Sequence, residues 1–565
     1  MKPSLLVLSV VLLVSTASIS EAALRKPVRA GGGMVVSADS MATAAGVDIL
    51  KRGGNAIDAA VAVGFCLAVT FPEAGNLGGG GFMVIRRKGG ESTMIDFREK
   101  APSAATRDMF LDPAGNPIPD KSTFGPMAAG VPGSVAGLLF ALRSYGTMER
   151  AEILRRAIEL ADGGIRVDRR LETSLKENLH EIASFPSSAK MFTRMGQPYR
   201  ENDLLRQPDL AHTLKLIGEK GEEGFYRGEI ASLIDAEMKR SGGIMTAADL
   251  EAYAAVERTP VKGTYRGFDI ISSAPPSAGG TVLLEMLNIL ERFNLREKGQ
   301  NSSQTIHLIA AAAQRAYADR ATYLGDPDFF SVPEGSLISK QYAAKLSRAI
   351  DSTRAIPSIS VSQGSLENGE GHHTTHYCVA DRFGNAVSVT TTLNGLYGCK
   401  LVVDGAGFFL NNEMDDFVVK PGVPNMFGLI GGDANAIQPG KRMLSSMTPT
   451  IIVKNEKPFM ILGARGGSRI PTTVAQIIVN VIDFGMNIQQ AVDAPRIHYQ
   501  WFPDKLYCER LGFARDVTDN LQRMGYTVDS TVESNAEAEA IMIDPGNGEF
   551  FGAPDPREEG VAIGF

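Results

Sequence analysis

The chain has 565 residues, of which 44% are hydrophobic and 21% are charged, and its formal net charge is −7. This composition is typical of a globular protein that is long enough to bury a large core. The acidic balance, together with the lack of a basic cluster in the sequence, argues against a general nucleic-acid binder.

The first residues have the pattern of a secretory signal. Lys2 is followed by the apolar run LLVLSVVLLV and then by small residues, such as Ser20 and Ala22, that suit a signal peptidase. The apolar run is too short for a comfortable transmembrane helix, so we expect a cleaved signal peptide at residues 1–22 and not an anchor. The rest of the chain is then expected to work outside the cytoplasm, as a periplasmic or secreted protein.

Two helices are predicted next. Asp39 or Ser40 can cap the first, which ends at the glycine pair Gly53-Gly54. The second, at residues 56–69, is apolar nearly all round and should be buried.

Strands and helices then come in blocks. Strand pairs joined by tight turns favour mixed or antiparallel sheets with helices stacked outside them, not a βαβ alternation. The predicted strands are 78–87, 91–102, 374–393, 447–454 and 459–467, and the predicted helical regions are 148–260, 303–325 and 472–485.

The hairpin TTHYCVADRFGNAVSVTTT, at residues 374–392, carries five threonines. If residues 382–384 form a three-residue loop with a left-handed Gly384, Asp381 faces Asn385 and Thr374 lies opposite Thr392. Directly opposed side chains point to the same face of a sheet, so two hydroxyls should meet at the open end of the hairpin.

Three interpretations of this hairpin are open. The threonines can be plain strand formers. A metal site of His372, His373 and His376 is disfavoured, because a loop that runs into a strand scatters the ring directions. The third interpretation is a threonine nucleophile activated by its own α-amine after cleavage of the preceding bond, since an α-amine with a pKa of about 7.7–8.0 can accept the hydroxyl proton. The spacing alone does not choose between the first and the third.

A set of motifs in chain order resembles the γ-glutamyltranspeptidases, members of the N-terminal nucleophile hydrolase superfamily. The motifs cover almost all of the chain after the predicted signal, which makes the resemblance specific. They are GNAIDAAVAVGFCLAVTFPEAGNLGGGGFM, DFREKAPSAATRDMF, GVPGSVAG, TTHYCVADRFGNAVSVTTTLN, LNNEMDDF, KPGVPN, GGDANAIQPGKRMLSSMTPT, GARGGSRIPTTV and APDPR.

The resemblance implies an α/β protein of the α+β type, a four-layer αββα sandwich of two mixed or antiparallel sheets flanked by helices. It also implies a proenzyme that cuts its own chain between His373 and Thr374. Residues 23–373 would be the large subunit and residues 374–565 the small subunit of a heterodimer. No cofactor or metal is implied, and neither nucleic acid nor, after signal removal, a membrane is an expected partner. The expected substrates are glutathione and other γ-glutamyl compounds, with amino acids or dipeptides as acceptors.

The resemblance also implies the catalytic roles. Thr374 would attack the carbonyl of His373 in the precursor, and later the γ-glutamyl amide, to form an acyl-enzyme that water or an amine resolves. Thr392 would orient the new α-amine. Gly466 and Gly467 would form the oxyanion hole, since glycines let backbone N–H groups approach a substrate closely.

A free γ-glutamyl group carries an α-carboxylate and an α-ammonium, so its pocket needs a cation and an anion. Arg98 suits the carboxylate, because a guanidinium can grip it bidentately. Asp416 suits the ammonium, and strand alternation is expected to turn the adjacent Asp415 away. The other residues of the implied substrate pocket are Asn394, Glu413, Ser445 and Ser446.

One position departs from the family pattern. Residues 424–441 match a lid loop in which bacterial members usually have a tyrosine where this chain has Phe427. A tyrosine there would hydrogen-bond toward Asn394, so we expect the lid of this chain to open more often.

Two alternatives remain at this point. A cephalosporin or glutaryl amide acylase of the same superfamily is disfavoured, because a glutaryl group has no α-amine for Asp416. An unprocessed binding or scaffold protein would stay in one piece on a denaturing gel.

The four scattered cysteines form no CxxC pair, which argues against a zinc site or a dense disulfide framework. One bridge among Cys378, Cys399 and Cys508 stays open.

Overall fold

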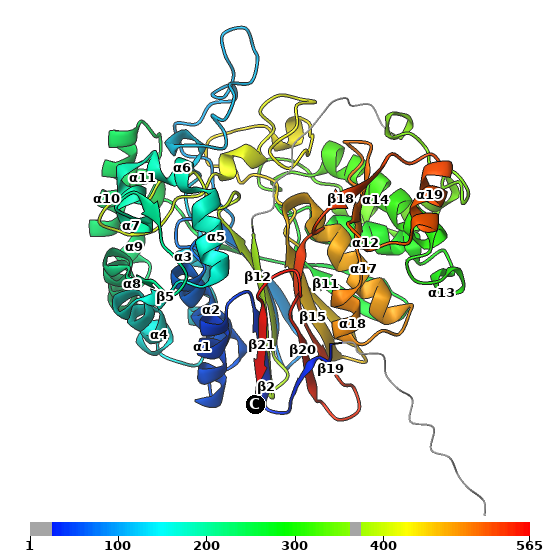
Figure 1. Cartoon of the computed structure of the whole chain (residues 1–565), viewed down its shortest axis with the longest axis horizontal. Helices are drawn as coiled ribbons and strands as arrows, with labels where there is room; N and C mark the ends of the chain where they lie inside the picture. The colour runs from blue at the N-terminus through cyan, green and yellow to red at the C-terminus, as the bar shows by residue number, and fades with distance from the viewer. Residues whose placement is uncertain (1–24, 362–373) are drawn as a thin grey trace, which may run out of the picture.

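The computed structural model describes residues 25–361 and 374–565. The predicted signal at residues 1–22, and His373 before the predicted cleavage bond, lie outside the described residues. The described part folds into four layers, in which helices cover the outer sides of two sheets that face each other (Figure 1). The predicted αββα sandwich is confirmed.

Within the described residues, the two central sheets have seven strands each, and every hydrogen-bonded pair of neighbours in them is antiparallel. The order of the first sheet is β1 (Val28–Ala30), β20 (Phe550–Ala553), β19 (Glu537–Ile543), β15 (Lys457–Arg465), β14 (Thr450–Lys454), β11 (Phe268–Ser272) and β10 (Val261–Tyr265). The order of the second sheet is β21 (Val561–Gly564), β2 (Gly33–Ser37), β12 (Thr375–Asp381), β13 (Ala386–Thr392), β3 (Gly80–Arg86), β4 (Ser92–Asp96) and β9 (Val256–Arg258).

The helices on the left of Figure 1 cover the outer face of the second sheet. Helix α2 packs between strands β12 and β13 and the outer helices, so it is buried along its whole length, as its all-round apolar sequence predicts. Asp39 caps α1 by accepting a hydrogen bond from the backbone N–H of Ala42, and Asn55 opens α2 with a capping box. The main helices of this layer are α1 (Ser40–Lys51), α2 (Ala56–Thr70), α3 (Ser134–Tyr145), α4 (Arg150–Gly163), α5 (Arg169–Glu177), α8 (Pro208–Lys220) and α10 (Gly228–Ser241).

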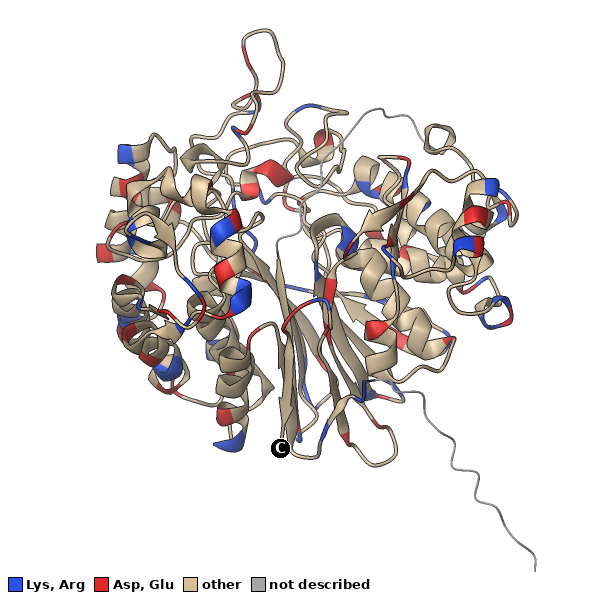
Figure 2. Cartoon of the chain, in the orientation of Figure 1, with Lys and Arg blue, Asp and Glu red and all other residues tan. Residues whose placement is uncertain are grey.

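The helices on the right of Figure 1 cover the first sheet. They are α12 (Gly279–Leu290), α14 (Ser303–Tyr323), α16 (Lys340–Arg348), α17 (Ile470–Ile482), α18 (Ile488–Asp493) and α19 (Arg515–Arg523). Figure 2 shows that the charged residues lie mainly on the outer helices of both sides and on the loops, while the central sheets carry few of them. Because both faces of each sheet are covered, strands such as β3 and β13 are buried at every position.

The threonine hairpin lies in the middle of the second sheet, between β2 and β3. Its register pairs Thr375 with Thr391, as the loop count predicts, and Gly384 has the predicted left-handed φ of 92°. The backbone N–H of Asp381 donates to the carbonyl of Asn385 at 3.2 Å, which closes the three-residue loop.

The described ranges contain no helix that is both long and apolar enough to cross a bilayer. All four cysteines lie within these ranges, and each is buried and free, so no bridge joins Cys378, Cys399 and Cys508.

Candidate active site

Two hydroxyls meet at the open end of the hairpin. The side chain of Thr374 donates to Oγ1 of Thr392 at 3.4 Å, and both side chains are buried. The Thr392 hydroxyl in turn accepts from the backbone N–H of Asn394 at 2.8 Å. The side chain of Asn76 donates to the carbonyl of Thr392 at 2.9 Å, which fixes the strand end. The hairpin register thus brings together the two threonines that the sequence paired.

A glycine turn faces this pair from the end of β15. Gly466 has a φ of 136° and Gly467 a φ of 55°, which are conformations that glycine adopts without steric cost. The short 3₁₀ turn Gly467–Arg469 and helix α17 follow at once. Gly467 lines the same cavity as Thr374, and Gly466 is its neighbour in the turn. Backbone N–H groups at such a helix start attract negative charge.

The cavity is small and is built from segments that lie far apart in the sequence. Its lining residues are Arg98, Thr374, Thr392, Asn394, Asp416, Phe427, Ser445, Ser446, Met447, Gly467 and Ile470. Nine of these were singled out in the sequence, whereas Met447 and Ile470 were missed because they carry no polar signal. Glu413 stands behind Arg98, outside this lining.

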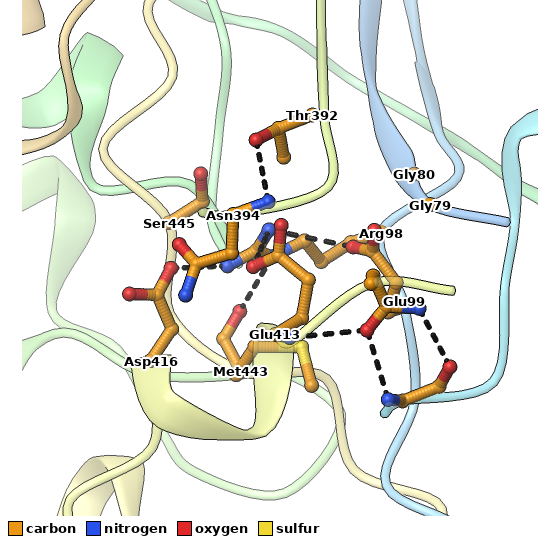
Figure 3. A network of polar contacts seen from close by, with 12 residues as sticks. Gly79, Gly80, Arg98, Glu99, Thr392, Asn394, Glu413, Asp416, Met443 and Ser445 are labelled. Carbon is orange, nitrogen blue, oxygen red and sulfur yellow. Dashed lines mark hydrogen bonds and ion pairs between the residues drawn. The ribbon is translucent and has the colours of Figure 1, made fainter. Parts of the chain in front are cut away.

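Arg98 is the centre of a buried charge cluster (Figure 3). Its guanidinium lies 2.6 Å from Glu413, 2.5 Å from Asp416 and 3.3 Å from Glu99, and only 1% of its side chain is exposed. Its Nε also donates to the carbonyl of Met443 at 3.2 Å. The predicted cation and anion of the pocket therefore pair directly with each other. Glu99 was missed in the sequence, although it directly follows Arg98 in DFREK.

Three buried carboxyl groups lie around this one guanidinium, and the pKa of each is raised. Burial raises the pKa of Glu99 to about 7, although the charge of Arg98 opposes the rise. Burial likewise raises the pKa of Glu413 well above its ordinary value, against the same opposing charge. The pKa of Asp416 is also raised, by burial. The cluster can therefore take up a proton near neutral pH.

The segment that carries Asp416 is a 3₁₀ helix, Glu413–Asp416, and the expectation of a strand there was wrong. Asp415 does point elsewhere, because its carboxylate accepts from the Ser122 hydroxyl at 2.7 Å and from the backbone N–H of Met426 at 2.9 Å. The turn of the helix, and not strand alternation, separates the two neighbouring carboxylates.

The predicted lid loop, at residues 424–441, contributes Phe427 to the wall of the cavity. The ring of Phe427 lies directly over Gly467, so close that a Cβ on that glycine would come within 2.4 Å of it. The side chain that contacts Asn394 is Met426, whose Sδ lies 3.5 Å from the amide nitrogen of Asn394. The resemblance had placed a contact with Asn394 at position 427 only for relatives with a tyrosine there, and it implied that Phe427 does not make this hydrogen bond. Asn425 ties the loop to the charge cluster by donating to Asp416 at 2.9 Å.

The two serines of the LSSM segment complete the cavity wall. The hydroxyl of Ser445 accepts from the backbone N–H of Met447 at 3.1 Å. The Ser446 hydroxyl lies 3.5 Å from a guanidinium nitrogen of Arg320. Each hydroxyl thus has a donor behind it.

Comparison with known proteins gives a consistent result. A family model described as gamma-glutamyltranspeptidase matches residues 42–565. The chain is 50% identical over 532 residues to the glutathione hydrolase proenzyme of Escherichia coli (strain K12), covering 94% of this chain and 91% of that protein. It resembles the crystal structure of a cephalosporin acylase from Bacillus halodurans with a TM-score of 0.85 and 27% identity, over 98% of this chain and 99% of that one. A gamma-glutamyltranspeptidase structure from Helicobacter pylori matches with a TM-score of 0.58 and 44% identity, over 62% of this chain and 99% of that one.

Proposed function

The chain belongs to the gamma-glutamyltranspeptidase family, and from this premise we propose how its residues carry out the chemistry. It is an autoprocessing γ-glutamyltransferase and hydrolase. Glutathione and other γ-glutamyl amides are the donors, and water, an amino acid or a short peptide is the acceptor. The observation that carries the assignment of roles is the meeting of Thr374, Thr392, Gly467, Arg98 and Asp416 around one small cavity.

The first reaction is cleavage of the chain before Thr374. The Thr374 hydroxyl attacks the carbonyl carbon of His373, and the peptide C–N bond breaks as the C–O bond of an ester forms. Water then hydrolyses the ester, which leaves a carboxylate on His373 and a free α-amine on Thr374. The products are a large subunit of residues 23–373 and a small subunit of residues 374–565.

The two fragments would stay together because their strands alternate in the sheets. Strands β12 and β13 of the small subunit pair with β2 and β3 of the large one. Cleavage at one bond breaks none of these ladders, so the product is a heterodimer.

The second reaction uses the same hydroxyl. The α-amine of Thr374, held by Thr392, accepts the hydroxyl proton while Oγ1 attacks the γ-carbonyl of the substrate. The N–H groups of Gly466 and Gly467 stabilise the oxyanion. The amine leaving group departs with a proton, and water or an acceptor amine then releases the γ-glutamyl group from the ester.

Recognition of the γ-glutamyl group uses both charges of the central ion pair. The α-carboxylate binds Arg98, with the hydroxyls of Ser445 and Ser446 as further donors. The α-ammonium binds Asp416, with Asn394 and Glu413 beside it. The direct Arg98–Asp416 contact gives way to these two contacts when the zwitterion binds. The enzyme acts in the periplasm or in the medium, after removal of the signal at residues 1–22.

A denaturing gel and a matched pair of variants test this proposal. Thr374→Ala should abolish self-cleavage and activity together, because one hydroxyl serves both reactions, and Thr374→Ser should keep some cleavage. Thr375→Ala is the control, because its hydroxyl has no hydrogen-bond partner among the described residues and alternation turns it to the other face of the sheet. A fragment 374–565 from the Thr374→Ala protein would show that another group cuts the chain.

An acylase acting on cephalosporins or glutaryl amides is the second candidate, favoured by the similarity to the Bacillus halodurans structure. The two candidates differ in the use of Asp416, which a glutaryl group leaves without an ammonium partner. Turnover of γ-glutamyl and glutaryl p-nitroanilides by the processed enzyme separates them. Faster turnover of the glutaryl compound would favour the acylase.

A further inference from the structure

Helix α14 places a buried cation beside the cavity. Arg320 is 5% exposed, and it forms no direct ion pair with a carboxylate of the described residues, although Asp416 is close enough to interact with its charge. Its Nε has no hydrogen-bond partner among these residues either. A buried cation that forms no direct ion pair is costly, and Asp416, the acid that interacts with it, is already paired with Arg98. A ligand carboxylate in the neighbouring pocket would compensate this charge.

The same face of α14 borders the site at two points. Tyr317, one turn before Arg320, donates from its hydroxyl to the carbonyl of Ser468 in the glycine turn. A guanidinium nitrogen of Arg320 lies 3.5 Å from the hydroxyl of Ser446. Arg320 and Asp416 also line one narrow cavity behind the lid. Arg320 therefore lies next to Ser446 and near Asp416, and both of these residues line the substrate cavity.

In the hydrogen bond between Arg320 and Ser446, only Arg320 can be the donor. A guanidinium only donates, so the Ser446 oxygen accepts from Arg320 and its own proton is left to donate elsewhere. Ser446 lines the cavity, whereas Arg320 does not. The hydroxyl proton is thus available to an acceptor in the cavity.

The charge balance of the cavity points to an anionic acceptor. Arg98, the cation that faces the cavity, is already surrounded by Glu99, Glu413 and Asp416. A substrate carboxylate that approaches Arg98 also approaches these three acids and is repelled by those that are ionised. A second positive charge close by offsets this repulsion, and Arg320 supplies it.

We propose that Arg320 is a positioning residue for the α-carboxylate of the γ-glutamyl group, and that it acts by fixing Ser446 as a hydrogen-bond donor and by adding positive charge behind it. This inference rests on the proposed function. It gives the large-subunit helix α14 a part in substrate selection, since only substrates with a carboxylate at the α-position use it.

The test compares two substrates that differ only in this carboxylate, γ-glutamyl p-nitroanilide and 4-aminobutyryl p-nitroanilide. Arg320→Gln should raise KM for the γ-glutamyl compound about tenfold or more, the size expected for a lost charge-assisted contact, with a smaller change in kcat. The same variant should change kcat/KM for the aminobutyryl compound less than twofold. Competitive inhibition by glutamate and by 4-aminobutyrate gives the same comparison where turnover is slow. Arg320→Lys, which keeps the charge, should recover part of the loss.

Arg315→Gln is the matched control. Arg315 is a buried arginine on the same helix, and its guanidinium donates to the backbone carbonyls of Ala311 and Ala349, away from the cavity. If Arg320→Gln lowers kcat/KM for both substrates by the same factor, or for neither, the inference is overturned. If Arg320→Gln does not fold, the same substrate pair measured with Arg320→Lys decides. Failure of the proposed function would appear separately, as a wild-type enzyme that does not release γ-glutamyl groups.

Discussion

Replacing Arg98 by glutamine should lower both the free energy of unfolding and the activity toward γ-glutamyl substrates. Arg98 is buried and lies within 3.3 Å of Glu99, 2.6 Å of Glu413 and 2.5 Å of Asp416. Removing one partner of a buried ion pair usually costs about 3–5 kcal/mol, because the remaining charge has no compensation. Three carboxylates lose their cation here, so we expect the free energy of unfolding at pH 8 to fall by at least about 3 kcal/mol.

The loss should depend on pH, because protonation relieves the uncompensated charge. Burial already raises the pKa of Glu99 to about 7 and that of Glu413 well above its ordinary value, and loss of Arg98 removes the charge that opposes the rise. An acid whose pKa is higher in the folded chain binds more protons when folded. Its contribution to stability is therefore lost as the pH rises from its unfolded pKa, about 4.3 for glutamate, through the folded value. The deficit of Arg98→Gln relative to wild type should be small at pH 5 and complete at pH 8.

Denaturant unfolding at the two pH values measures this deficit, and a second substitution tests its cause. The Arg98→Gln/Glu413→Gln protein has one acid fewer to bury, so it should regain part of the stability at pH 8. Both proteins should lose about ten- to a hundredfold in kcat/KM for a γ-glutamyl anilide, since a charge-assisted contact is worth about 1.5–3 kcal/mol. An equal stability deficit at pH 5 and pH 8, or a double variant no more stable than the single one, would refute the electrostatic reasoning.

Three further substitutions have defined outcomes. Asp416→Ala should still be processed, but its kcat/KM should fall about ten- to a hundredfold for γ-glutamyl anilide and much less for glutaryl anilide, and a change below twofold for the γ-glutamyl anilide would remove Asp416 from the pocket. Phe427→Tyr should slow access and shift the partition between glycylglycine transfer and hydrolysis while leaving self-cleavage intact, and an unchanged partition would mean that other contacts hold the lid. Gly467→Ala should lower kcat, because its Cβ would come within 2.4 Å of the Phe427 ring and its φ of 55° is strained for alanine by about 1–2 kcal/mol. Adding Phe427→Ala should restore part of that loss, and no recovery would place the strain in the backbone alone.

The sequence by itself determined the features that depend on neighbours along the chain. Turn chemistry at Gly384 and the two-residue period of the strands set the hairpin register, and with it the meeting of Thr374 and Thr392. The cap at Asp39 and the full burial of helix α2 could be predicted from the sequence for the same reason, since capping and hydrophobic pattern depend on a few neighbouring residues. The family motifs supplied the remaining candidates, most of which line one cavity.

Only the tertiary structure decided which of these candidates contact one another. Arg98 and Asp416 are 318 residues apart, yet they form an ion pair, and no local pattern announces it. The layers of the sandwich also bring Met426 against Asn394, and they place Arg320 next to Ser446. Local preferences act within a turn or a hairpin, whereas these contacts arise when separate layers pack. Charge pairing across the site, and the pKa values that follow from it, therefore come from the folded arrangement.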